Sequence, residues 1–324
     1  MTGRVRTVTL VAAAALAAAG ATIGVTLATR SHPPRATATL KPRAGYPPLY
    51  LDLGVRTDRA AAAIRHASDL YGRGRHAAAL AIFGRYRDLE AQIGAAFAGW
   101  PRGSIQRLQA LAASHPTRAV VRLNLGVADF WAGKGDDAVT SWREAVRVEP
   151  DSPAAVSADT FLHPGFAPNL PFFVPTFAFP PALASLSPPR QLAELERRAR
   201  TGGVRGKLLY GVALQRLGRP RSAAREFADA ARLAPNDPDA QVAAAVGLFS
   251  KADPTPAFAR LGPLSARFPK AATVRFHLGA LRLWPRQLAK ARAQFRLAVQ
   301  DEPQSRIGAE ARLFLDQLRK AGTS

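Results

Sequence analysis

The sequence predicts an all-α fold, a solenoid of helical hairpins that follows a single N-terminal transmembrane helix. Two observations predict the hairpins: prolines recur at a constant interval, and apolar residues between them follow the helical period. A third observation predicts the transmembrane helix, since residues 7–29 carry no charged side chain. At 1.5 Å per residue, such a run is long enough to cross a hydrocarbon core of about 30 Å.

The composition excludes several kinds of site. Hydrophobic residues make up 48% of the 324 residues, which is a globular content, and there is no cysteine. The absence of cysteine excludes disulfide frameworks, thiolate metal sites and cysteine nucleophiles. The net charge of +22 favours attraction to anionic surfaces. It does not by itself indicate nucleic acid, because arginine and alanine are abundant together, as in chains with GC-rich coding sequences.

The N-terminus has the layout of a signal anchor. Residues 1–6 form a basic head that contains Arg4 and Arg6, and residues 7–29 form the predicted transmembrane anchor. This run exceeds the 7–15 apolar residues that are usual in a cleavable signal peptide. A cleaved signal is the alternative, because small residues at 17–21 offer a small-x-small cleavage pattern.

The flanking charges leave two orientations open. Basic residues lie on both sides of residues 7–29, and their count favours a cytoplasmic C-terminal side. The short basic head favours the opposite placement, so we expect a single-pass protein of the cell membrane with an extracytoplasmic repeat domain. Residues 30–55 are rich in proline, which fixes φ and removes amide donors, so they predict an extended linker.

The repeat period appears in the prolines and in four further columns. Pro116 and Pro150 are separated by the same interval as Pro235, Pro269 and Pro303. In each of three units, a glycine lies 24 residues before the repeat proline, and an alanine lies 12 residues before it. An aromatic residue lies eight residues before the proline, and a second alanine lies five before it. These signature residues are Gly126, Ala138, Trp142, Ala145 and Pro150, then Gly211, Ala223, Phe227, Ala230 and Pro235, then Gly279, Ala291, Phe295, Ala298 and Pro303.

This pattern resembles the tetratricopeptide repeat, a helix–turn–helix unit whose length of about 34 residues equals the interval between these prolines. The glycine and the first alanine would let the two helices cross closely, and the aromatic residue would fill the space between helices of adjacent units. Proline ends the second helix because it cannot donate the helical hydrogen bond. The resemblance implies N-terminal helical repeats at 56–152 and C-terminal helical repeats at 190–321, with a capping helix at Ile307–Lys320.

One segment interrupts the repeats. Pro150 and Pro235 are two and a half periods apart, and residues 153–189 between them are rich in proline and phenylalanine. The prolines predict neither a helix nor a central strand there, whereas residues 191–200 predict a short helix. The phenylalanines need a dry surface. Residues 161–181 either cover the concave face of the repeats or fill the seam where the period slips.

The chemistry of an enzyme is missing from the sequence. No two of the six histidines are three or four residues apart, and there is no glycine-rich phosphate loop or nucleophile elbow. We therefore expect a non-enzymatic protein with no catalytic residue, no cofactor and no metal site. We also expect neither a nucleic acid nor a small-molecule substrate as its ligand.

The resemblance to tetratricopeptide repeats implies a scaffold that binds a protein or peptide partner on a concave face lined by the first helix of each pair. This lining is apolar and lacks the basic and amide residues by which clamp-type repeats hold a peptide carboxylate. The groove residues that the resemblance implies are Val120, Leu123, Val127, Phe130, Leu208, Val212, Val242, Val246, Phe249, Phe276 and Leu283.

The alternative is an arginine-rich envelope accessory protein that binds acidic polymers or lipid headgroups. Binding by basic patches weakens steeply with ionic strength, whereas binding in an apolar groove is nearly indifferent to salt.

Overall fold

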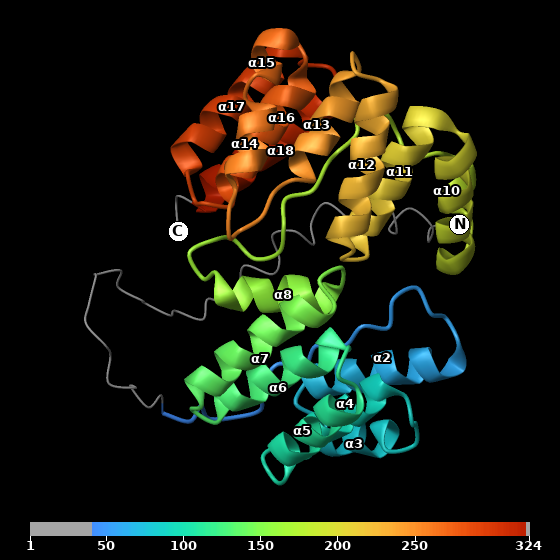
Figure 1. Ribbon diagram of the computed structural model, residues 1–324, viewed down its shortest axis with the longest axis vertical. Coiled ribbons are helices and arrows are strands. Elements are labelled where there is room, and N and C mark those ends of the chain that lie inside the picture. Colours follow the sequence, from blue (N-terminus) through green and yellow to red (C-terminus); the bar gives the residue numbers. More distant parts are fainter. Residues whose placement is uncertain (1–40, 322–324) are drawn as a thin grey trace. The chain divides into compact units, whose positions relative to one another are not determined.

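The computed structural model describes residues 41–321 (Figure 1). These residues form helices joined by loops and turns, and no strand occurs among them. The predicted basic head and transmembrane anchor lie outside the described residues, as does the first part of the linker. Within 41–321, no helix combines the length and the apolar character that a membrane span requires.

The N-terminal helix set consists of seven helices that pack in succession along the chain. The last of them packs on both of the two preceding helices. Buried side chains of these helices form one hydrophobic core. The helices are α2 (Arg59–Gly72), α3 (His76–Phe83), α4 (Leu89–Ala98), α5 (Ser104–Ser114), α6 (Ala119–Trp131), α7 (Gly135–Val148) and α8 (Pro153–Leu162).

The C-terminal helix set follows after a long extended segment and the single helical turn α9 (Pro181–Ala184). Its strongest contacts join α11 with α12 and α16 with α17, the two pairs that contain complete repeat columns. The helices are α10 (Pro188–Thr201), α11 (Gly203–Arg216), α12 (Pro220–Leu233), α13 (Pro238–Val246), α14 (Thr255–Leu261), α15 (Leu264–Arg267), α16 (Ala272–Leu283), α17 (Leu288–Asp301) and α18 (Arg306–Ala321).

The repeat glycines make room for the repeat aromatics of the same pair. A Cβ added to Gly126 would lie 2.5 Å from the Trp142 indole, which is far inside van der Waals contact. The same relation joins Gly211 to Phe227. The aromatic side chain therefore packs within its own helix pair, and it also reaches the next unit, where Trp142 stacks on Phe161 of α8 at 4.7 Å.

The proline-rich segment at 153–189 contains more helix than its composition predicts. Residues 153–162 form α8, because Ser152 caps its first turn by accepting the Ala155 N–H at 3.1 Å. Pro153 occupies the first turn, where a missing amide costs no hydrogen bond. The non-helical part is thus confined to residues 163–180, which include a turn at 164–165. The short helix predicted at 191–200 is present as α10 and begins earlier, at Pro188.

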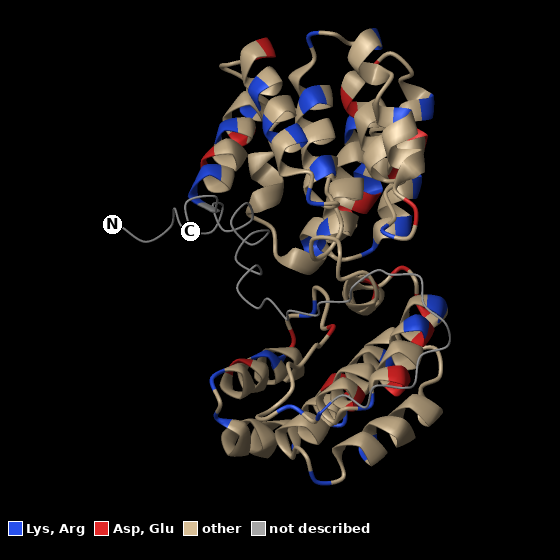
Figure 2. Ribbon diagram, turned by 90° about the vertical axis from the view of Figure 1, so that its left-hand side faces the viewer, with Lys and Arg blue, Asp and Glu red and all other residues tan. Residues whose placement is uncertain are grey.

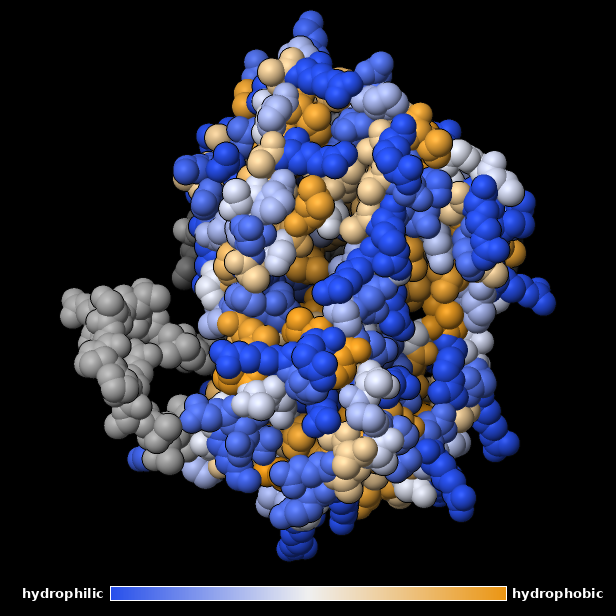
Figure 3. Space-filling view, viewed as in Figure 1, coloured by the Kyte–Doolittle hydropathy of each residue, from blue (hydrophilic) through white to orange (hydrophobic). Residues whose placement is uncertain are grey.

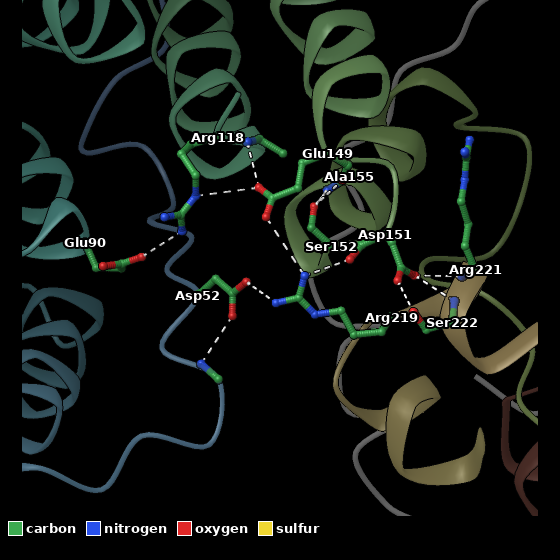
Figure 4. Close-up of polar contacts among 12 residues, drawn as sticks. Asp52, Glu90, Arg118, Glu149, Asp151, Ser152, Ala155, Arg219, Arg221 and Ser222 are labelled. Carbon is green, nitrogen blue, oxygen red and sulfur yellow. Dashed lines mark hydrogen bonds and ion pairs between the residues drawn. The ribbon is translucent and has the colours of Figure 1, made fainter. Parts of the chain in front are cut away.

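The half-period slip leaves two helices without a partner of their own unit. α8 packs on α6 and α7, whereas α10 packs on α11, and the extended residues 163–180 lie between them in the chain. Polar contacts of the α7–α8 loop contribute to the junction of the two sets (Figure 4). Asp151 accepts the main-chain N–H groups of Arg221 at 2.7 Å and Ser222 at 3.1 Å, at the first turn of α12.

Arg219 is the second link at this junction. It donates from Nη1 to the main-chain oxygen of Asp151 at 2.8 Å. The same guanidinium lies 3.8 Å from a carboxylate oxygen of Asp52 and 3.9 Å from one of Glu149 (Figure 4). It therefore joins three segments of the chain: the one before α2, the α7–α8 loop and the α11–α12 turn.

Candidate peptide-binding site

Two extended segments of the chain lie against the first helices of the repeat pairs. The insert, residues 163–180, crosses α11, α13 and α16, whose contacted surface we call the C-terminal face (Figure 1). The arm, residues 43–54, lies on α6 and α2, whose contacted surface we call the N-terminal face. Each segment brings prolines and aromatic or aliphatic side chains to its face.

The insert buries one phenylalanine completely. Phe173 is 1% exposed and lies edge-on to Phe227 of α12, with ring centroids 5.5 Å apart. On its other side it stacks on the imidazole of His277 at 5.2 Å. The next residue, Val174, packs in the cluster that contains Phe276. Burial of such side chains stabilises the docked insert by about 1.5–3 kcal/mol each.

Side chains of the C-terminal face accept three main-chain amides of the insert. Each acceptor comes from a different first helix, so the insert connects three repeat units through its backbone. The threonine hydroxyl at the third position donates to the same carboxylate oxygen at 2.7 Å. The pairs are Phe173 N–H with Gln215 Oε1 at 2.9 Å, Val174 N–H with His277 Nε2 at 2.9 Å, and Thr176 N–H with Asp239 Oδ2 at 2.9 Å.

Side-chain donors at the start of α18 and the end of α16 bind carbonyl oxygens of the insert. Nη1 of Arg306 donates to the main-chain oxygens of Pro175 at 2.7 Å and Phe177 at 2.8 Å. The indole N–H of Trp284 donates to the oxygen of Asn169 at 2.9 Å. This set of contacts recognises an extended backbone, because most of the polar bonds go to main-chain atoms.

The prolines of the insert fit the same pattern. Pro171 and Pro175 are buried, and proline has no amide that would be left without a partner there. The residues whose amides are accepted, at 173, 174 and 176, are not prolines. The order of prolines and other residues therefore matches the order of acceptors on the face.

Two buried titratable groups contact the insert. His277 is fully buried, and burial lowers its pKa to about 4. Its Nδ1 lies 2.6 Å from the main-chain oxygen of Thr273, which places the proton on Nδ1 and leaves Nε2 free to accept from Val174. Asp239 is 4% exposed, and burial raises its pKa, an effect that the hydrogen bonds from Thr176 partly oppose.

The arm is bound in a similar way on the N-terminal face. The amide side chain of Asn124 accepts the Tyr50 N–H at Oδ1, 3.1 Å, and donates from Nδ2 to the Tyr50 oxygen at 2.7 Å. The guanidinium of Arg43 lies 4.3 Å above the Phe130 ring. Residues 43–54 form no helix, and they pack on the repeats instead of serving as a free spacer.

Asn124 and His277 occupy the same column of the repeat. They precede the repeat prolines Pro150 and Pro303, respectively, by the same number of residues. Both therefore project from the same place on a first helix, and both accept a main-chain N–H of an extended segment. The apolar lining that the sequence predicts thus also contains the amide side chains of Asn124 and Gln215, which bind main-chain atoms. The repeat column that Asn124 and His277 share is the sequence signal that could have revealed these two acceptors.

None of the predicted groove residues is exposed, and they belong to the same hydrophobic clusters as side chains of the arm and the insert. Phe130 and Leu283 are partly buried. The arm packs against the cluster that contains the groove residues of α6, and the insert packs against the clusters that contain the later ones. The buried members are Val120, Leu123, Val127, Leu208, Val212, Val242, Val246, Phe249 and Phe276.

Within residues 41–321, no three or more histidine and acidic side chains come together in a way that could hold a metal ion. Asn124, Gln215 and His277 are hydrogen-bonded to main-chain atoms of the arm and the insert, so the two faces hold segments of the chain's own backbone. What this arrangement can do chemically is to exchange hydrogen bonds with an extended backbone.

No protein-family model matches this chain, and no curated protein matches it. Among solved structures, the chain is similar to the TPR2AB domain of yeast Sti1 in a complex with pHSP90, at 13% identity over 82% of this chain and 98% of that chain, with a TM-score of 0.31. It is similar to the APC/C hetero-tetramer Cut9–Hcn1 at 17% identity, over 82% of this chain and 50% of that chain, with a TM-score of 0.32.

A third similar structure is yeast Tom70, at 11% identity over 82% of this chain and 54% of that chain, with a TM-score of 0.31. At these TM-scores, none of the three similarities carries an argument about this chain. Its description as a helical-repeat fold rests on its own helix pairs and on the contacts between the repeat glycines and aromatics.

Proposed function

We propose that this chain is a non-enzymatic interaction scaffold that binds a polypeptide partner through the first helices of its repeats. One observation carries the proposal. In both helix sets an extended segment lies on the first helices, and residues of one repeat column, Asn124 and His277, accept its main-chain amides. A surface that binds a backbone in this way suits any partner that offers the same extended conformation.

The arm and the insert set the condition for partner binding. Because both belong to the same chain, each competes with a partner at an effective concentration that is roughly millimolar for a short tether. A partner must therefore bind its face more tightly than the resident segment, or gain contacts beyond it. The scaffold is closed in the free protein and opens when such a partner is present.

Photo-crosslinking tests this function. A photoreactive amino acid at Phe130 or Leu283, the two partly buried groove positions, should crosslink a partner in cells that express the full chain. The matched control is Leu233, which is 59% exposed on the second helix α12. We expect partner adducts from the two groove positions and none from Leu233. Equal adducts at all three positions would refute a role for the first-helix faces.

We also propose that residues 7–29 tether the scaffold to the cell membrane, with the repeats on the extracytoplasmic side. The uncharged run after Arg4 and Arg6 supports this proposal. Full-length protein should then resist extraction from membranes by alkaline carbonate. A mature N-terminus near Thr22, found by mass spectrometry, would instead establish cleavage of a signal peptide.

The second candidate function, binding of acidic polymers or lipid headgroups, has one observation in its favour. Residues 190–321 contain 25 lysines and arginines against 11 acidic residues. Figure 2 shows these basic residues spread over the helices, and Figure 3 shows hydrophilic side chains over most of one face. Binding of this kind should weaken steeply between low and high salt, whereas binding at the first-helix faces should change little.

A further inference from the structure

We infer that the C-terminal face is a receptor for one class of ligand, an uncharged and extended segment of proline and phenylalanine, of which residues 166–177 are the resident copy. The inference rests on the proposed function and names the partner class for one of its two faces. Three features of the face define this class: its charges, a slot for an aromatic ring and the spacing of its contacts.

The charged groups of the face favour a neutral ligand. No lysine, arginine, aspartate or glutamate occurs in residues 160–189. Oδ2 of Asp239 accepts from Thr176, and Nη1 of Arg306 donates to two carbonyl oxygens of the insert. A ligand carboxylate at the position of Thr176 would be placed beside the buried Asp239 carboxylate, and the two like charges would repel each other.

The aromatic slot follows from the repeat columns. Eleven residues after Pro150 lies Phe161, and its ring stacks on Trp142 at 4.7 Å. The equivalent residue after Pro303 is Phe314, whose ring lies 5.2 Å from that of Phe295.

After Pro235 the same column holds the smaller Val246. There the ring that contacts the repeat aromatic Phe227 comes from the insert, as Phe173. The junction between α12 and α13 thus has a place for a ring that α13 does not supply, and a ligand phenylalanine fits that place.

The spacing of contacts gives the order of residues in the ligand. Four residues after Phe173, the ring of Phe177 lies under the guanidinium of Arg205, 4.4 Å from its centroid. Between them, Val174 and Thr176 offer amides, and Pro175 offers none. The face therefore fits the order phenylalanine, valine, proline, threonine, phenylalanine, in an extended conformation.

A synthetic fluorescent peptide of residues 164–180 tests the inference on purified full-length protein. The unaltered chain should bind it weakly, because the resident copy competes from a tether. Phe173→Ala in the protein weakens the resident copy and leaves the helices of the face unchanged, so this variant should bind the peptide at least about tenfold more tightly. Val174→Pro, which removes the amide that His277 accepts, provides a second weakened variant if the first does not fold.

Two control peptides examine the ligand class in the weakened variant. A peptide with alanine at the position of Phe173 should bind about a hundredfold more weakly, as expected for loss of a buried ring. A peptide with aspartate at the position of Thr176 should not bind. Circular dichroism checks that each protein variant stays helical.

The outcomes separate this inference from the proposed function. If a helical, weakened variant binds none of the peptides, the inference is wrong, and crosslinks at Phe130 and Leu283 still decide the scaffold function. If the aspartate peptide binds as tightly as the unaltered one, the ligand class is wrong. If crosslinks at both groove positions fail while the peptide binds as expected, the face binds only its own segment and the proposed function is wrong.

Discussion

Val174 donates its main-chain N–H to Nε2 of His277 at 2.9 Å, although 103 residues separate them in the sequence. This bond requires a neutral imidazole, because a proton on Nε2 would turn the acceptor into a donor. The insert and the C-terminal face are therefore linked through a group whose charge depends on pH.

The first prediction concerns acid. His277 has its pKa lowered to about 4, below its ordinary value of 6.5, so the unfolded chain takes up this proton at a higher pH than the folded chain. The contribution of His277 is fully present above pH 6.5 and decreases as the pH falls from 6.5 to about 4, by at most about 3 kcal/mol.

Asp239 acts in the opposite direction, since burial raises its pKa and favours its protonated form in the folded chain. Urea unfolding of His277→Gln separates the two effects, because glutamine does not titrate. The variant should lose less stability than the unaltered protein between neutral and acidic pH. An identical loss in both proteins would show that His277 does not control this dependence.

The second prediction concerns the buried ring. Phe173→Ala should lower the free energy of unfolding by about 3–5 kcal/mol, because it removes the contacts with Phe227 and His277 and leaves a cavity. Phe172 is only partly buried, so Phe172→Ala is the matched control and should cost less. If chemical denaturation finds equally small losses of unfolding free energy in both variants, the ring of Phe173 is not buried between Phe227 and His277.

The third prediction concerns the repeat glycines. Gly211→Ala should destabilise the protein by roughly 1–3 kcal/mol through overpacking, because the added methyl group collides with the Phe227 ring. Gly72→Ala in α2 meets no atom within 4 Å and should be neutral or slightly stabilising. Thermal melts of the two variants compare the positions, and a similar shift in both would contradict the close approach of α11 and α12.

The fourth prediction concerns the junction of the helix sets. Asp151→Ala removes the acceptor for the first amides of α12 and should cost about 1–3 kcal/mol. Because Asp151 belongs to the α7–α8 loop, its loss should also separate unfolding into two transitions. Asp58 caps α2 within its own set, so Asp58→Ala should weaken that helix start and leave the number of transitions unchanged. One transition in the Asp151 variant would assign the coupling to other contacts.

The sequence predicts the regular part of this fold well, because contacts between successive helix pairs impose residue columns. Gly126, Gly211 and Gly279 face repeat aromatics for that reason. The start of α8 is missed, because a high proline content over 153–189 hides the fact that Pro153 sits at a helix start.

The binding faces are predicted only in part from sequence. The apolar lining follows from helical periodicity, but the arm and the insert bind chiefly through main-chain atoms, which have no sequence signature. The partners of Asn124 and His277 are therefore visible only once the chain is folded.

Amide hydrogen exchange tests most directly whether an extended peptide is held on the C-terminal face. The amides of Phe173, Val174 and Thr176 are bonded to Gln215, His277 and Asp239, so in full-length protein they should exchange far more slowly than in the free peptide of residues 164–180. Exchange of all three amides at the rate of the free peptide would contradict the docking of the insert and the receptor inferred from it.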